Sequence, residues 1–581
     1  MVTKFLPFAA LAILTAGVGC QGSIGDSMGM PGPGTGTGPG GAQPPGSGPP
    51  TTPRPGDPNT VVPPGGPPST GAIDPNAAGP MPLLRLSRRE YNNTVRDLLG
   101  DATNQANGFA SDRESEFLFR RGGLVATKDL EDIKDAAATI AASIESKVPT
   151  LAPCPMGMAE DACARKFAST FGLRAYRRPI ASEEVDRLMA LYTAGRTELM
   201  LNYAGAIRLM VEGMLQAPAF LYHWELGSGA PIVEGQVVKL NHYEVASRLS
   251  YFVWGSMPDP VLFEAAAAGK LGTQAEIEAQ ARRLLGDARG KETVSAFAEE
   301  WLNLDQVAER PKDPMLYPEF KDDLKAAMTA EMRTFIANVV FDGDGKLGSL
   351  LTATNTFVNQ PLAAVYGIKG VTGADLKPAM LDGAQRAGLL TRAGFLTVTG
   401  ATDGSHPAKR GRRVYERMLC GELPPPPPVV PPPKPPSAGG TTRERFTEHD
   451  TNPCAGACHE IMDKIGFAFE NFDGIGKYRT TDNGGAVDAT GSIELDGKRQ
   501  PFANALELSS MLAKSPLVAS CFAKQWLRYA FKRTDTEGDR GSLEGITTSF
   551  TKSNSVADLL VSVAGSRSFR YRTPGNGEKL Q

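Results

Sequence analysis

The chain has 581 residues, enough for several domains, and it is rich in glycine (64 residues) and proline (46 residues). Its formal net charge is -3, so the chain lacks the excess of basic residues expected of a nucleic-acid-binding protein. The sequence also lacks a glycine-rich phosphate loop, a Gly-x-Ser-x-Gly turn and a zincin motif, so it indicates neither nucleotide binding nor hydrolase chemistry.

The N-terminus has the pattern of an export signal. Lys4 precedes an uncharged, mostly apolar run at 5–18 that is too short to span a membrane as a helix. Cys20 follows two small residues, as at a lipoprotein cleavage site, although Gly17 stands where such sites usually have leucine. We predict a lipoprotein-type signal peptide at 1–20 and an exported protein, periplasmic or at the cell surface, anchored to a lipid membrane through acylated Cys20. The alternative is an ordinary signal peptide with an incidental cysteine.

Two segments have compositions that cannot form a core. Residues 21–80 are dominated by Gly, Pro, Thr and Ser, which predicts a disordered tether. As a flexible coil, this tether would hold the folded part on the order of 40 Å from its anchor. The stretch PPPPPVVPPPKPP at 424–436 predicts a polyproline II linker, to which we assign residues 424–440.

Elsewhere apolar residues recur mainly at helical spacing. The first expected helix follows Ser87, a residue type that caps helix N-termini. Further helices are expected through the middle third, after residue 500, and at 129–148, 159–173, 181–195 and 201–222. A turn-rich alternating segment at 480–500 predicts a small hairpin. The sequence therefore predicts a mainly α, multi-domain helical protein.

Export changes how the cysteines are interpreted, because disulfides form in oxidising compartments. Cys154 and Cys163 bracket the short loop CPMGMAEDAC and are expected to pair. Cys420 and Cys521 then remain as a couple, although sequence alone does not fix the connectivity.

The stretch NPCAGACHEIMDKIGFAFENFDGIGKYR, residues 452–479, contains a Cys-x-x-x-Cys-His motif. Covalent haem attachment needs two thiols for the porphyrin vinyl groups and an adjacent histidine as axial ligand to the iron. Cys454, Cys458 and His459 supply these groups, with one residue more than usual between the cysteines. Small residues in that interval would allow a looser turn.

Two other chemistries fit the same residues. Cys454 and Cys458 can form a disulfide, which would leave His459 as an ordinary surface residue. Zinc could use both cysteines with His449 and His459, but adjacent residues rarely point at one ion without strain.

Residues near the motif suggest further roles. His449, ten residues upstream of His459, is a possible distal haem ligand, and Met511 is a weaker candidate. Glu470 and Asp473 could orient the axial histidine, but an aromatic turn packed on the core is favoured. The basic run at 409–413 after His406 could bind haem propionates or another anion, but such runs are more often solvated faces.

Eight blocks spread over 82–575 together resemble one family. In chain order they are RLSRREYNNTVRDLLG, FGLRAYRRPI, MLQAPAFLYHWE, LSYFVWGSMPD, FVNQPLAAVYGI, HPAKRGRRVYERML, CHEIMDKIGFAFENFDGIGKYR and CFAKQWLRYAFKR. The chain resembles multi-domain exported proteins built from domains of unknown function associated with planctomycete-type cytochrome c modules. Cys458 and His459 match the core motif of that family, Cys454 lies one place early, and Lys464 replaces the usual proline.

This resemblance favours haem over the disulfide, and the adjacency of Cys458 and His459 leaves zinc as the least favoured of the three. It implies a covalent haem c at Cys454 and Cys458, with His459 on the iron. The expected function is extracytoplasmic electron transfer with a redox partner protein, or oxidoreductase activity on an unknown substrate. The alternative is a non-redox surface lipoprotein that binds a polymer or protein partner, with a structural Cys454–Cys458 disulfide.

The same blocks suggest how the folded part is divided. The expected parts are helical domains at 81–150, 151–232 and 233–370, a helical segment at 371–423 before the linker, a cytochrome c-like motif segment at 441–500 and a C-terminal helical domain at 501–581.

Overall fold

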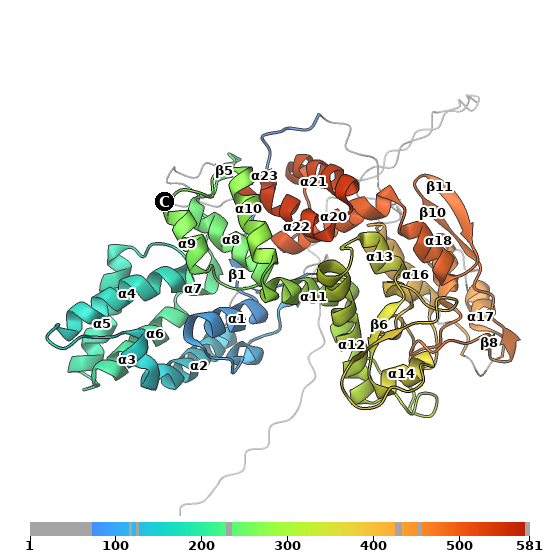
Figure 1. Ribbon diagram of the computed structural model, residues 1–581, viewed down its shortest axis with the longest axis horizontal. Helices are drawn as coiled ribbons and strands as arrows, with labels where there is room; N and C mark the ends of the chain where they lie inside the picture. The colour runs from blue at the N-terminus through green and yellow to red at the C-terminus, as the bar shows by residue number, and fades with distance from the viewer. Residues whose placement is uncertain are drawn as a thin grey trace, which may run out of the picture. The chain divides into compact units, whose positions relative to one another are not determined.

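The computed structural model describes residues 72–114, 119–123, 127–227, 235–423, 433–435, 437, 439–449 and 456–575. The expected signal peptide, the lipidation site at Cys20, most of the tether and linker, and Cys454 lie outside these residues. Among the described residues, helices dominate and the strands form only two-stranded sheets (Figure 1). The predicted mainly α fold is therefore confirmed.

The N-terminal helices pack around one core that includes Tyr91, Ile140, Phe167 and Met210. This core unites side chains from the expected segments 81–150 and 151–232. The helices are α1 (Arg88–Leu99), α2 (Thr127–Ile144), α3 (Val148–Leu151), α4 (Glu160–Tyr176), α5 (Ser182–Thr197), α6 (Tyr203–Gln216) and α7 (Pro218–Leu221).

Two of these helices show how local sequence sets their ends. Ser87 caps α1, as predicted, in a capping box in which the Glu90 carboxylate accepts from the Ser87 backbone N–H at 2.8 Å. The single helix expected at 201–222 divides into α6 and α7, because Pro218 has no N–H for a continuing helical hydrogen bond.

The larger core joins the middle of the chain to its C-terminus. Phe297 of α11 stacks on Trp526 of α20 with ring centroids 3.7 Å apart, and Trp254 and Trp301 are buried in the same cluster. The helices in this part are α8 (His242–Trp254), α9 (Pro260–Ala267), α10 (Gln274–Leu285), α11 (Ala288–Leu302), α12 (Asp322–Ala337), α13 (Leu347–Thr352), α14 (Gln360–Tyr366), α15 (Ala393–Val398), α16 (Pro407–Met418), α17 (Thr442–His449), α18 (Gly456–Gly466), α19 (Ala505–Leu512), α20 (Pro516–Phe531), α21 (Arg540–Ser553), α22 (Val556–Gly565) and α23 (Arg567–Arg570).

The strands pair locally or tie distant segments together. Two consecutive hairpins, β8–β9 and β10–β11, occupy the region where the sequence predicts one. The antiparallel pairs are β1 (Leu84–Arg85) with β4 (Tyr222–His223), β2 (Arg113–Glu114) with β3 (Arg120–Arg121), β5 (Val238–Lys239) with β12 (Tyr571–Arg572), β6 (Asn355–Val358) with β7 (Lys377–Met380), β8 (Thr481–Asp482) with β9 (Gly485–Ala486), and β10 (Gly491–Leu495) with β11 (Lys498–Phe502).

The end of the predicted tether is folded. Arg567 donates hydrogen bonds to two carbonyl oxygens in residues 76–80, at 2.6 and 3.1 Å, and the backbone N–H of Thr573 donates to a third at 3.0 Å. Ala78 is buried. The prediction of disorder up to residue 80 is wrong here, because a segment without large apolar side chains is held through its backbone carbonyls.

The predicted polyproline linker and α17 lie in the sequence between α16 and α18, two helices that share a core. Val414 and Tyr415 of α16 and Ile465 of α18 belong to the same buried cluster, and α16 packs directly on α18. Two glycines allow this close approach. A Cβ at Gly411 would overlap the carbonyl oxygen of Met462, and a Cβ at Gly466 would overlap that of Pro407.

Both disulfides expected from the sequence are present. Cys154 pairs with Cys163, and Cys420 pairs with Cys521 across a sequence separation of 101 residues. In the part of the chain that the structure describes, no helix is both long and apolar enough to cross a membrane.

The glycine contact between α16 and α18 predicts a selective effect of an added methyl group. Gly411→Ala should lower the free energy of unfolding by about 1–3 kcal/mol, because the backbones would have to separate. Gly348→Ala in α13 is the matched control, since the nearest atom to its Cβ would be the Ala513 carbonyl oxygen at 3.9 Å. Because alanine favours helix more than glycine does, the control should keep or raise stability. Urea denaturation followed by circular dichroism measures the free energy of unfolding of the two variants. An equal loss of stability in both would contradict the close contact at Gly411.

Candidate functional site

Cys458 and His459 lie at the start of α18, on a helix fixed by its contact with α16. The two helices run antiparallel, since Gly466 lies against Pro407 and Gly411 lies against Met462. The motif is thus attached to the larger core through backbone contacts.

His459 is oriented by a buried carboxylate one helical turn later. Its Nδ1 lies 3.0 Å from Oδ2 of Asp463, and the Asp463 side chain is only 1% exposed. A carboxylate accepts hydrogen bonds, so this contact favours a proton on Nδ1 and a lone pair on Nε2. Histidines that bind metals through one nitrogen characteristically donate from the other in this way. This role of Asp463 was not predicted from the sequence, although its spacing of four residues from His459 places both on one helix face.

Cys458 carries a free, partly buried thiol. Burial raises the pKa of this thiol, and the nearby Arg412 guanidinium partly offsets that effect. Within the described ranges, no three or more His, Cys, Asp or Glu side chains gather as a metal site.

The candidate distal ligands lie on different helices. His449 ends α17, and its side chain lies outside the described part. One turn earlier, Phe446 packs in a small cluster with Met462 of α18, so α17 lies beside the motif helix. Met511 lies on α19, which packs on α13 and β11.

His406, flagged in the sequence for its basic neighbours, lies near the motif. Its ring contacts Phe446 with centroids 5.1 Å apart, and its Nδ1 accepts from the Lys409 backbone N–H at 3.4 Å as the cap of α16. Burial lowers the pKa of His406 to about 3, with further lowering by Lys409, Arg410 and His459. Periodicity along the chain gave no signal that His406 and His459 are close enough to interact.

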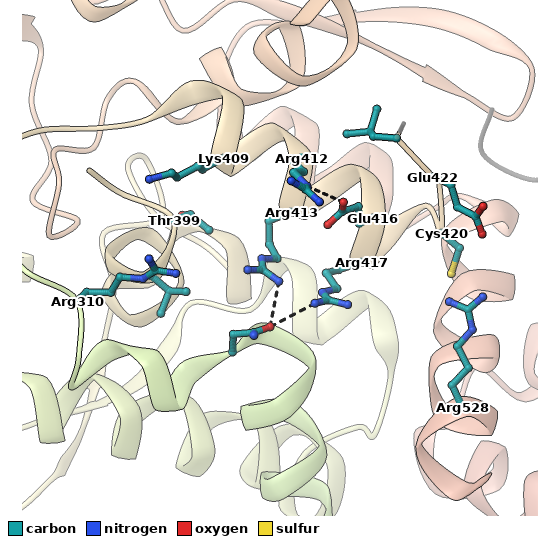
Figure 2. Close-up of a pocket in the computed structure, with 14 residues that line it drawn as sticks. Arg310, Thr399, Lys409, Arg412, Arg413, Glu416, Arg417, Cys420, Glu422 and Arg528 are labelled. Carbon is teal, nitrogen blue, oxygen red and sulfur yellow. Dashed lines mark hydrogen bonds and ion pairs between the residues drawn. The ribbon is translucent and has the colours of Figure 1, made fainter. Parts of the chain in front are cut away.

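Arg410 does not belong to a solvated face. Its side chain is fully buried, and it donates to the carbonyl oxygens of Phe469 and Phe472 at 2.8 Å and of Asp473 at 2.5 Å. The solvated-face interpretation is therefore wrong for Arg410, because one guanidinium supplies several donors to a tight turn. Lys409 and Arg412 of the same run have exposed side chains that line a pocket (Figure 2).

Glu470 and Asp473 serve this turn. The Glu470 carboxylate accepts from the Ser405 hydroxyl at 2.7 Å and from Arg479 at 3.0 Å. Asp473 accepts from two backbone N–H groups of its own turn, at 3.0 and 2.8 Å. These contacts agree with the favoured packing role.

Five family models match successive parts of the chain, and all five are described as proteins of unknown function. They are DUF1587 at 85–144, DUF1595 at 163–225, DUF1592 at 240–368, DUF1588 (PSCyt3) at 386–482 and DUF1585 at 498–569. The protein is thus a multi-domain assembly of uncharacterised domains. It belongs to the family built from the planctomycete cytochrome c-associated domains, as the resemblance implied.

The DUF1588 match contains the candidate site. It includes α16 before the polyproline stretch and α18 after it, in agreement with their direct packing. No curated protein and no solved structure matches the chain.

The low pKa of His406 predicts a specific loss of stability in acid. Between pH 6.5 and about 3 the unfolded chain binds a proton at His406 that the folded chain does not, so the free energy of unfolding falls as pH falls. The expected loss is about 2 kcal/mol between pH 6.5 and 5. His406→Asn keeps a capping acceptor and should flatten this part of the curve. Chemical denaturation across this pH range measures the free energy of unfolding of the native chain and of His406→Asn. If the two fall in parallel as the pH falls, His406 is not the group responsible.

Proposed function

We propose that this protein is an exported, lipid-anchored c-type haem protein. Its function is extracytoplasmic electron transfer, or oxidation and reduction of a substrate still to be found. The observation that carries this proposal is the pair formed by His459 and the buried Asp463, next to the free thiol of Cys458.

The residues present fit a covalently held haem. The His459–Asp463 contact favours a lone pair on Nε2 for an axial bond to iron. Each of Cys458 and Cys454 would add across one vinyl group: a C–S bond forms and the thiol hydrogen passes to the other vinyl carbon, so no oxidant is needed. When bound, haem supplies an iron centre that carries one electron at a time.

The chain's own residues would hold the site in place. Asp463 restrains rotation of the His459 ring, and the α16–α18 contact fixes the helix that carries both residues. His449 is favoured over Met511 as the distal ligand, because Phe446 places α17 beside α18.

Visible absorption and a covalent haem stain test the proposal. The chain, produced by a host that attaches haem c, should show a Soret band and keep its stain after denaturation. His459→Gln should abolish the native haem spectrum. His242→Gln is the control, since His242 accepts from the Leu271 backbone N–H far along the chain from the motif. A native protein without a Soret band or stain would overturn the proposal.

Asp463→Asn tests the orienting role separately. An amide accepts less strongly than a carboxylate, so the affinity of His459 for iron should fall by about 10–100-fold, as when the hydrogen-bond partner of other metal-binding histidines is changed. Competition by added imidazole, followed in the visible spectrum, measures this effect. The covalent stain should remain, because the thiols are unchanged.

Mass spectrometry separates haem from the structural disulfide. A haem adduct on the peptide that holds Cys454 and Cys458 supports the proposal. A loss of two hydrogens there would support the non-redox surface lipoprotein instead.

A further inference from the structure

Three exposed methionines lie where α4 begins and α5 ends, on two helices that pack side by side (Figure 1). Met156 is fully exposed, Met200 is 80% exposed and Met158 is half exposed. Methionine is normally buried, where its long apolar side chain fills gaps in a core. Packing therefore does not explain why three thioethers face solvent in this part of the protein.

A tight turn carries two of the three methionines. The backbone N–H of Met158 donates to the carbonyl oxygen three residues earlier at 3.1 Å, and Gly157 between the methionines has a φ of 88°. A turn of this kind requires glycine at that position. The disulfide between Cys154 and Cys163 ties the turn to α4. Met156 and Met158 are thus presented together from one restrained turn.

One guanidinium group brings the third methionine to this turn. Arg196, near the end of α5, pairs with Glu160 at 2.7 Å and donates to the Leu201 carbonyl oxygen at 2.9 Å. Glu160 lies two residues after Met158, and Leu201 directly follows Met200. The segments that carry the three thioethers therefore meet at Arg196.

The backbone of Met200 is strained. Its φ is 51°, in the left-handed region where glycine or asparagine commonly ends a helix. A methionine costs free energy in this conformation and gains little by burial, because its side chain is exposed. Stability alone would favour glycine at this position, so the methionine indicates a role for its sulfur.

The other groups near the three sulfurs are already engaged. Cys154 and Cys163 are joined in their disulfide, so neither supplies a thiolate. The Glu160 carboxylate is paired with Arg196. Among the residues that the structure describes, no three or more His, Cys, Asp or Glu side chains gather to bind a harder metal ion. Thioether sulfur is a soft ligand that selects Cu(I).

We propose that Met156, Met158 and Met200 form a site for Cu(I), which they bind through their thioether sulfurs. Each methionine side chain has three rotatable bonds, which allows the sulfurs to converge on one ion. Asp161 and Glu198, exposed in the same two segments, add negative charge that favours a cation. The site lies outside the haem motif. The inference goes beyond the proposed function and does not rest on it.

Methyl NMR of the full chain, labelled with carbon-13 at its methionine methyl groups, tests the proposal. The probe is Cu(I) alone, kept reduced by ascorbate in the absence of oxygen. The signals of Met156, Met158 and Met200 should shift together and saturate together. Met315 and Met380 provide an internal control, since both are exposed and lie elsewhere in the chain.

Leucine variants remove the sulfur and keep an apolar side chain. Met156→Leu combined with Met158→Leu should weaken Cu(I) binding, measured at the Met200 signal, by more than about tenfold. Even a change in a residue that only supports a metal ligand costs about 10–100-fold in affinity. Met315→Leu combined with Met380→Leu is the matched control, and it should leave the titration of the Met200 signal unchanged.

Met200→Gly separates binding from folding. Because glycine suits the left-handed backbone, this variant should be at least as stable in urea as the native chain, yet should bind Cu(I) more weakly. The proposal is overturned if the three signals shift no more than those of Met315 and Met380. It is also overturned if the double leucine variant keeps the native affinity. Neither result depends on a haem spectrum, so this proposal and the proposed function can fail separately.

Discussion

The close contact between α16 and α18 is the constraint on which the candidate site depends. Gly411 and Gly466 let the two backbones meet without intervening side chains. One face of α16 therefore fixes the helix that carries Cys458 and His459.

Buried arginines in this protein bond to several acceptors or to a buried carboxylate. Arg177, at the end of α4, and Arg410 each donate to several backbone carbonyls. Arg392 forms a fully buried pair with Glu331 at 2.6 Å. Burial favours such contacts, because an uncompensated charge in the core is costly.

Local sequence predicted the local structure well, and long-range packing poorly. Ser87 and the apolar spacing that follows it indicated α1, and the spacing of Cys154 and Cys163 indicated their bond. The folding of residues 76–80 against Arg567 depends on carbonyl groups that every sequence contains, so no pattern identified it. At the site, the motif identified Cys458 and His459, and helix spacing was enough to add Asp463. The proximity of His406 to His459 results from the packing of α16 on α18, which the sequence did not indicate.

The bond between Cys420 and Cys521 closes a covalent ring around the motif. All of α17, α18 and α19, together with the polyproline stretch, lie inside this ring. Closing a loop of this length removes about 4–5 kcal/mol of conformational freedom from the unfolded chain. A protease that cuts the chain once within its proline-rich segment would therefore open this ring without separating the two halves of the protein. The candidate redox helix, α18, would stay covalently linked to the chain before the cut through the Cys420–Cys521 bond.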